Sequence, residues 1–123
     1  KAEAAIDALV KHDLVVVHVE APDEAGHNGS VKDKVKAIED VDSKVVGPIL
    51  DAFLGKTDFR ILITPDHLTP IAKRTHSSEP VPFIMCGTGI DRVHEQPYSE
   101  QAAANTGLKI EHGHELMAYF LRE

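Results

Sequence analysis

The pattern of hydrophobic positions changes its period several times along the chain. Residues 14–19 form an almost unbroken apolar run of mostly β-branched side chains, and residues 59–64 and 81–86 form two further apolar runs. Short runs of this kind are typical of strands that are buried on both faces of a sheet. Because helical patterns lie between these runs and after them, we expect an α/β fold with a mostly parallel sheet and flanking helices.

The longest helical pattern begins after Ser30. Ser30 can cap this helix, and Asp33, three residues later, completes a pair that resembles a capping box. Gly47 and Pro48 should kink or divide the helix, and Gly55 should end it. The apolar residues that recur at helical spacing are Val35, Ile38, Val41, Val45, Ile49 and Phe53.

Shorter elements are expected in the rest of the chain. Residues 2–11 have the pattern of the end of a helix, 100–105 of a short helix, 108–110 of an edge strand and 113–121 of a terminal helix. Residues 65–80 contain three prolines and no clear period. We therefore expect a long loop there, and structureless segments of this length usually have a function.

Composition and charge narrow the class of protein. The chain has 123 residues, 42% of them hydrophobic, which suits about one domain. No apolar run is long enough to span a bilayer, and no signal-peptide pattern is present. The net charge of -7 argues against a nucleic-acid partner and is compatible with a cation site. The chain opens in helical periodicity and without Met, as though it were cut from a longer protein.

Cysteine usage points to a compartment. The single cysteine, Cys86, excludes an internal disulfide and fits a reducing, cytoplasmic environment. Cys86 follows Met85 in an apolar run, so we expect it to be an inert core residue.

Three polar clusters lie next to the three expected strands. PDEAGH follows the first strand, PDH follows the second, and RTHSSEP lies in the loop before the third. Sites in open α/β sheets are built where loops converge at the carboxyl ends of strands, so the clusters can meet. Each contains a histidine and two contain an aspartate, which are ligands that zinc, manganese and similar divalent ions accept.

The first cluster has the spacing of a chelating pair. Asp23 and His27 are four residues apart, so a helical turn places both side chains on one face. Pro22 can open such a turn without losing a hydrogen bond, and Gly26 leaves room for a close approach. The pair can therefore bind one ion.

The other two clusters supply further candidates. Asp66 and His67 are adjacent, so they can share an ion only where the strand breaks, and Pro65 marks such a break. His76 contributes a histidine from the third cluster. Each motif alone has a plainer explanation as a surface or loop feature, whereas the three together favour a metal site.

Several other polar residues have a structural explanation. His18 lies inside the first apolar run and is expected to be a hydrogen-bonded core or supporting histidine rather than a ligand. Lys73 and Arg74 could hold a phosphate near the ions or could simply be solvated. The remaining histidines, expected to be solvated, are His12, His94, His112 and His114.

These motifs resemble a known family. VHVEAPDEAGHNG, KAIEDVD, TPDHLTPI with THSSEPVPF, and GHELM are similar to the C-terminal part of the archaeal-type, cofactor-independent phosphoglycerate mutases of the alkaline phosphatase superfamily. The similarity runs over nearly all of the chain. It implies that residues 1–123 are the C-terminal part of a metal-dependent phosphotransferase catalytic domain with an alkaline-phosphatase-like fold.

The resemblance also implies a two-metal site. Asp23, His27 and His76 match the ligands of one ion, and Asp66 and His67 match two ligands of the other. Manganese is the expected metal, with magnesium, cobalt or zinc as alternatives, and no 2,3-bisphosphoglycerate is required. The ions would lie roughly 3.5 to 5 Å apart and would activate a serine and stabilise the leaving alkoxide.

The implied reaction converts 3-phosphoglycerate to 2-phosphoglycerate through a phosphoserine. The family's nucleophilic serine, its fourth-ligand aspartate and its substrate-binding cations match no segment of this chain, so no catalytic residue is expected here. The serines without the nucleophile's context are Ser30, Ser43, Ser77, Ser78 and Ser99.

Two other functions stay open. The first is another enzyme of the superfamily, namely a phosphatase, phosphopentomutase or phosphodiesterase. The second is a non-catalytic metal-binding module, although structural zinc sites usually close four ligands within one domain. Phosphoglycerate is the expected partner, with no nucleic acid or membrane, and the sequence does not set the oligomeric state.

Overall fold

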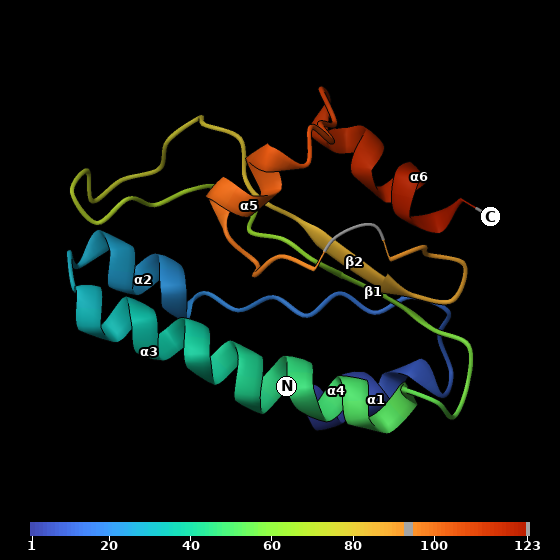
Figure 1. Cartoon of the computed structure of the whole chain (residues 1–123). Helices are drawn as coiled ribbons and strands as arrows, with labels where there is room; N and C mark the ends of the chain where they lie inside the picture. The colour runs from blue at the N-terminus through green and yellow to red at the C-terminus, as the bar shows by residue number, and fades with distance from the viewer. Residues whose placement is uncertain (93–94, 123) are drawn as a thin grey trace. The chain divides into compact units, whose positions relative to one another are not determined.

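A computed structural model describes residues 1–92 and 95–122 (Figure 1). The chain divides into two compact units. The first unit comprises Lys1–Thr57 and Leu68–Ser78, and the second comprises Asp58–His67 and Glu79–Glu123. The expected mixture of helices and strands is confirmed, and each unit has its own elements.

The first unit is helical. Its elements are α1 (Ala2–Leu9), α2 (Ala21–His27), α3 (Val31–Val41), the π-helical segment η1 (Asp42–Val46) and α4 (Gly47–Phe53). Helix α2 packs along α3, and α1 packs against α4 (Figure 1).

The predicted helix cap is confirmed. The Ser30 hydroxyl accepts a hydrogen bond from the Asp33 backbone N–H at 3.2 Å and donates to the Asp33 carboxylate at 2.7 Å. This satisfies one of the backbone donors that the first turn of α3 cannot pair internally. Helix α3 consequently begins where the sequence predicts.

The predicted division at Gly47 and Pro48 is also confirmed, in the form of a π-helical turn. Pro48 has no N–H to donate and its ring would clash with the carbonyl one turn earlier. The wider turn over Asp42–Val46 accommodates this, and α4 then starts at Gly47. Helix α4 ends at Phe53, and Gly55 follows with φ +71°, in the left-handed region that glycine adopts most easily.

The strand expected over residues 14–19 is not formed. This segment is extended but pairs with no strand among residues 1–92 and 95–122 (Figure 1). Val15 and Val17 are half-buried, whereas Val16 is 77% exposed. A run with strand propensity becomes a strand only when a neighbouring backbone supplies the ladder of hydrogen bonds.

The second unit contains the sheet. Strands β1 (Arg60–Ile63) and β2 (Ile84–Gly87) form an antiparallel pair in which Arg60 lies opposite Gly87 and Ile63 opposite Ile84. Both strands lie in the predicted apolar runs, but their antiparallel pairing differs from the expected parallel one. A parallel pair needs a crossover, usually through a helix. The connection here has no helix and doubles back on itself through an antiparallel bridge between Leu68 and Ser77.

The rest of the second unit is helical or irregular. Helix α5 (Glu100–Asn105) begins at Ser99, whose hydroxyl accepts from the Ala102 N–H at 3.2 Å. A 3-10 turn, η2 (Gly113–Glu115), leads into α6 (Leu116–Leu121), as predicted for the terminal helix. The edge strand expected at residues 108–110 is wrong, because these residues pair with no other strand in the described part of the chain.

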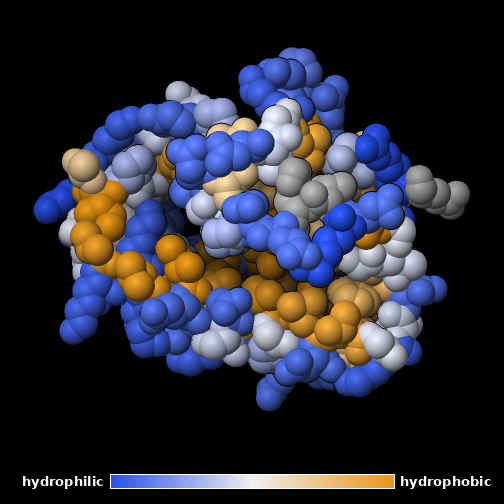
Figure 2. Space-filling model, in the orientation of Figure 1, coloured by the Kyte–Doolittle hydropathy of each residue, from blue (hydrophilic) through white to orange (hydrophobic). Residues whose placement is uncertain are grey.

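The deeply buried apolar residues are few. Among the described residues they are Ala2, Ala5, Ala25, Pro82 and Phe120, and many larger apolar side chains are exposed, including Val35 and Ile38 on α3. Figure 2 shows apolar side chains open at the surface of one face. No helix in the described part of the chain has the length and apolar character needed to cross a membrane.

Cys86 does not lie in the core. Exposed and half-buried residues alternate along β2, and Cys86 shares its exposed face with Ile84. The two faces of a strand can differ in this way because successive side chains point in opposite directions. Partial burial still raises the pKa of the Cys86 thiol, because the charged thiolate is disfavoured away from water.

Candidate metal centre

Helix α2 presents Asp23 and His27 on one face, as their spacing predicts. Pro22 lies in the first turn of the helix, where its missing N–H is not needed. The Asp23 Oδ2 atom lies 3.5 Å from His27 Nε2. The helix therefore brings one carboxylate and one imidazole to the same place.

His76 joins this pair from the loop of the first unit. Its Nε2 atom lies 3.1 Å from His27 Nε2 and 3.4 Å from Asp23 Oδ1. The two imidazole rings are tilted by 54° with centroids 5.0 Å apart. We call Asp23, His27 and His76 the DHH cluster.

The spacing in the DHH cluster suits a small divalent cation. Ligand atoms about 2.1 Å from a tetrahedral ion lie about 3.4 Å from one another. The two histidine Nε2 atoms are 3.1 Å apart. His76 Nε2 lies 3.4 Å from one Asp23 carboxylate oxygen, and His27 Nε2 lies 3.5 Å from the other. Two imidazoles and a carboxylate are also ligands that first-row divalent ions accept. The donor set therefore fits a metal ion.

The backbone at Arg74 sets the proton position of His27. His27 Nδ1 lies 3.0 Å from the Arg74 carbonyl oxygen. Because a carbonyl can only accept, Nδ1 carries a proton, and the Nε2 atom of the neutral ring keeps its lone pair for the cluster. Two nitrogen lone pairs cannot face each other at 3.1 Å, so a proton on one of the two Nε2 atoms or a cation is needed between the rings.

Thr69 supports the carboxylate of the cluster. Its hydroxyl donates a hydrogen bond to Asp23 Oδ1. Thr69 is only 4% exposed, and its carbonyl accepts from Lys34 Nζ at 2.6 Å. Thr69 is not among the site residues predicted from the sequence. A threonine that follows His67 and Leu68 and precedes a proline has no local pattern that indicates a site residue. The residue to which its hydroxyl donates, Asp23, is 46 residues away in the sequence.

Asp66 and His67 lie beyond the end of β1, in the second unit. Asp66 Oδ2 lies 3.5 Å from His67 Nε2, and the His67 N–H donates to Asp66 Oδ1 at 3.1 Å. The adjacent side chains can approach each other because the strand has ended at Ile63, two residues before Pro65, so the chain is not in a regular strand at this point. They can offer ligands to one ion.

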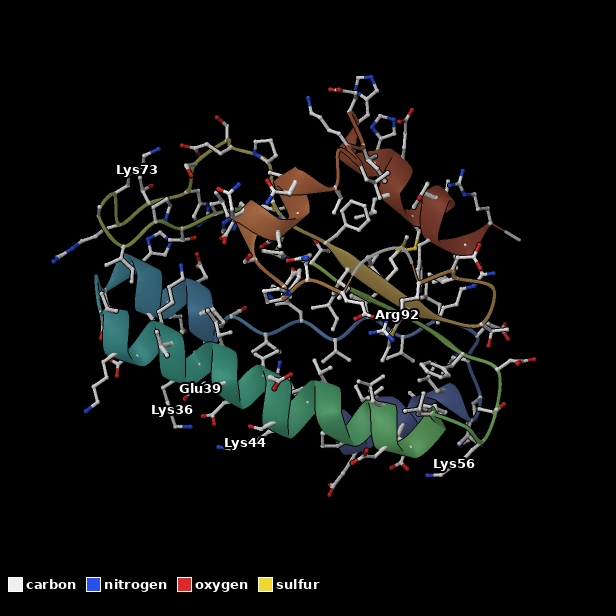
Figure 3. All side chains as sticks on the ribbon, in the orientation of Figure 1. Lys36, Glu39, Lys44, Lys56, Lys73 and Arg92 are labelled. Atoms are coloured by element: carbon white, nitrogen blue, oxygen red, sulfur yellow. The ribbon has the colours of Figure 1, made fainter. Side chains whose placement is uncertain are left out.

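Lys73 and Arg74 differ in how they lie. Figure 3 shows Lys73 projecting outward from the loop, away from α2. The Arg74 guanidinium lies against Gly29, since a Cβ at Gly29 would come 2.4 Å from Arg74 Nε. Arg74 therefore packs at the end of α2.

His18 is not a core histidine. Its side chain is 66% exposed, and its Nε2 lies 3.6 Å from a Glu20 carboxylate oxygen. The reason is that the segment 14–19 has no sheet partner to bury it in the described part of the chain. His12, His112 and His114 are exposed, as predicted. His94 lies outside the described residues.

The serines that the structure describes have mostly structural roles. Ser30 and Ser99 cap helices, and the Ser43 hydroxyl donates to the Glu39 carbonyl at 2.7 Å. The Ser77 hydroxyl oxygen is buried without a hydrogen-bond partner.

Comparison with known proteins adds a family. A family model described as Metalloenzyme superfamily matches residues 1–122. The chain is 47% identical over 122 residues to a probable 2,3-bisphosphoglycerate-independent phosphoglycerate mutase of Geobacter sulfurreducens, covering 98% of this chain and 31% of that protein. It is 44% identical over 117 residues to 2,3-bisphosphoglycerate-independent phosphoglycerate mutase 2 of Methanothermobacter thermautotrophicus, covering 95% of this chain and 29% of that protein.

A solved structure is also similar. The PH0037 protein from Pyrococcus horikoshii matches with a TM-score of 0.89 and 34% sequence identity, covering 98% of this chain and 36% of that one. The chain thus spans 29 to 31% of the length of these curated relatives.

Proposed function

We propose, from the premise that this chain belongs to the Metalloenzyme superfamily, that it forms the metal-binding part of a cofactor-independent phosphoglycerate mutase. Such an enzyme interconverts 3-phosphoglycerate and 2-phosphoglycerate without 2,3-bisphosphoglycerate. The observation that carries the proposal is the convergence of Asp23, His27 and His76 at cation spacing. Relatives named for this activity support it over almost the full chain.

In this proposal the DHH cluster holds one divalent ion, and Asp66 and His67 supply two ligands of a second. Manganese is the proposed metal, as the resemblance to the family implies, and magnesium, cobalt or zinc are alternatives, since carboxylate and imidazole ligands accept several divalent ions. When bound, such ions polarise phosphoryl oxygens and make a hydroxyl group a better nucleophile.

The residues of this chain have positioning roles in the proposed reaction. The Arg74 carbonyl holds the proton of His27 at Nδ1, which leaves Nε2 free to bind. The nucleophilic serine is proposed to lie outside the matched stretch, since the hydroxyls of Ser30 and Ser99 are engaged in helix caps.

We make two further proposals, one on the sheet that residues 14–19 join and one on the metabolic role of the protein. Residues 14–19, with their strand composition, are proposed to join a mostly parallel sheet of an alkaline-phosphatase-like domain in the longer protein. A role in glycolysis or gluconeogenesis in the cytoplasm follows from the proposed substrate and agrees with a chain that has a single cysteine.

The metal proposal is tested by titrating the metal-free chain with Mn²⁺ and measuring the heat of binding. We expect weak binding that falls by roughly a hundredfold or more in His27→Gln, because a ligand is lost where even a supporting residue accounts for ten- to a hundredfold. His12→Gln removes an exposed histidine and is the matched control. Equal affinity of the wild type and His27→Gln would refute the site.

The reaction is tested in the longer protein of which this chain is proposed to be a part. We expect ³¹P NMR to show 3-phosphoglycerate turning into 2-phosphoglycerate, and the Asp23→Asn variant to lose this turnover. Release of free phosphate instead would assign the protein to the hydrolases of the superfamily. Metal binding without either reaction would favour the non-catalytic module.

A further inference from the structure

We propose that Thr69 is a positioning residue that orients the Asp23 carboxylate toward the bound ion. This inference rests on the proposed function, because it assumes that the DHH cluster binds a metal. It assigns a role to a residue that is not itself a metal ligand in the proposed site.

The hydrogen bond from Thr69 divides the work of the two carboxylate oxygens. Thr69 donates to Oδ1 of Asp23, which also lies 3.4 Å from His76 Nε2, whereas Oδ2 lies 3.5 Å from His27 Nε2. The terminal torsion of an aspartate is soft, so an unsupported carboxylate would rotate. A hydroxyl that donates to one oxygen limits this rotation and leaves the other lone pairs directed at the cluster.

Thr69 is itself held firmly enough to act in this way. It precedes Pro70, which restricts its backbone to extended conformations. Its carbonyl accepts a hydrogen bond from Lys34 of α3 at 2.6 Å. The position of the Thr69 hydroxyl is therefore restricted by Pro70, the next residue in the chain, and by Lys34 of α3.

Helix α2 lies directly against Thr69. A Cβ at Gly26 would come 2.6 Å from the Thr69 carbonyl oxygen and 2.9 Å from its methyl group. Gly26 is thus needed so that the helix carrying Asp23 can approach Thr69 closely. The Asp23 carboxylate is therefore supported in three ways. Gly26 lets α2 come close, the buried Thr69 donates the hydrogen bond, and Lys34 holds the Thr69 carbonyl.

A purely structural role for Thr69 makes a different prediction. A buried hydroxyl that only needs a hydrogen-bond partner would affect the stability of the chain but not the affinity of the metal site. A positioning role affects the metal affinity of a chain that is still folded. The two roles can therefore be separated by measuring both quantities.

The test compares Thr69→Val, which keeps the methyl group and replaces the hydroxyl with a second methyl group, with Thr69→Ser, which keeps the hydroxyl. We expect Thr69→Val to weaken Mn²⁺ binding by ten- to a hundredfold, the range seen for residues that support metal ligands. Thr69→Ser should stay within a few-fold of the wild type. Calorimetric titration gives the affinity, and urea unfolding in metal-free buffer gives the stability of each chain.

The outcomes separate this inference from the proposed function. Wild-type affinity in Thr69→Val, together with a large loss in Asp23→Asn, would overturn the positioning role and leave the metal site intact. Equal Mn²⁺ affinity of the wild type and Asp23→Asn would overturn both the positioning role of Thr69 and the proposed metal site. Should Thr69→Val fail to fold, Thr69→Ala against Thr69→Ser makes the same comparison.

Discussion

Arg74 illustrates how one backbone conformation can serve a neighbouring side chain. Its φ of +52° lies in the left-handed region, which costs a residue with a Cβ roughly 1 to 2 kcal/mol. In this conformation its carbonyl accepts the Nδ1–H of His27. Strained backbone is often found where a structure has to hold a functional group in place, and here the group is a proposed metal ligand.

Tyr98 should make the stability of the folded chain depend on pH. Its hydroxyl donates to the Pro82 carbonyl at 2.9 Å. Burial, with a smaller contribution from the charge of Glu100, raises the pKa of Tyr98 to about 12. The folded state therefore holds this proton more tightly than the unfolded chain, whose tyrosine pKa is about 10.

The sign of the pH effect follows from linkage. The stabilisation is fully present below about pH 10 and is lost as the pH rises through 10 to about 12. Because Tyr98 is 45% exposed, the loss should be modest. We expect the wild type to lose more unfolding free energy than Tyr98→Phe over this range, measured by urea denaturation at several pH values. Parallel pH profiles of the two chains would contradict the prediction.

At the scale of elements, the β1–β2 pair depends on Gly87. Gly87 has φ +122°, and a Cβ there would come 2.1 Å from the Phe59 carbonyl oxygen. No side chain can occupy that position without moving the backbone at the start of β1. The close approach of these two backbone segments therefore requires a residue with no side chain at position 87.

Substitution of Gly87 should be far more damaging than substitution of another glycine with positive φ. We expect Gly87→Ala to cost about 3 kcal/mol or more of unfolding free energy, because strain and a steric clash add. Gly107→Ala is the matched control. Gly107 has φ +70° and nothing within 4 Å of its Cβ position, so only about 1 kcal/mol is expected. Equal losses in thermal or urea unfolding would show that the clash is relieved easily.

Arg60 ties the C-terminal helix to the strand pair in the second unit. Its side chain donates to the Thr88 carbonyl at 2.7 Å, to the Phe120 carbonyl at 3.1 Å and to the Arg122 carbonyl. These carbonyls lie near the end of β2 and at the end of α6, where helical carbonyls have no partner within the helix. A single side chain thus joins three segments.

At the scale of the molecule, the chain carries the proposed metal ligands and matches only part of the length of its relatives. It spans 31% of the Geobacter sulfurreducens relative. The hydroxyls of Ser30 and Ser99 cap helices, and the Ser43 hydroxyl bonds to the helix backbone. The extended residues 14–19 pair with no strand in the described part of the chain.

We therefore expect the purified 123-residue chain to have no mutase activity. The proposed ligands can bind an ion, but the phosphoryl group needs a nucleophile to receive it. The measurement is 3-phosphoglycerate conversion with Mn²⁺ present, with a full-length cofactor-independent phosphoglycerate mutase as the positive control. Turnover close to that of the control enzyme would mean that a nucleophile lies in this chain and that the roles proposed above are wrong.

Local features of this protein were determined by the sequence itself. The Ser30 cap, the division before Pro48 and the shared face of Asp23 and His27 were all predicted and found. Each depends on residues within one or two turns of each other. Hydrogen-bonding geometry and helical spacing act over that distance without help from the rest of the fold.

Longer-range features were decided only by the tertiary structure. His27 meets His76 across 49 residues, and Thr69 meets Asp23 across 46. The resemblance to a family implied the first contact, but no local pattern encodes either distance. The antiparallel pairing and the exposure of His18 and Cys86 likewise differ from expectation. Pairing direction and burial depend on which distant segments pack together, and apolar runs specify a preference for strand without specifying a partner.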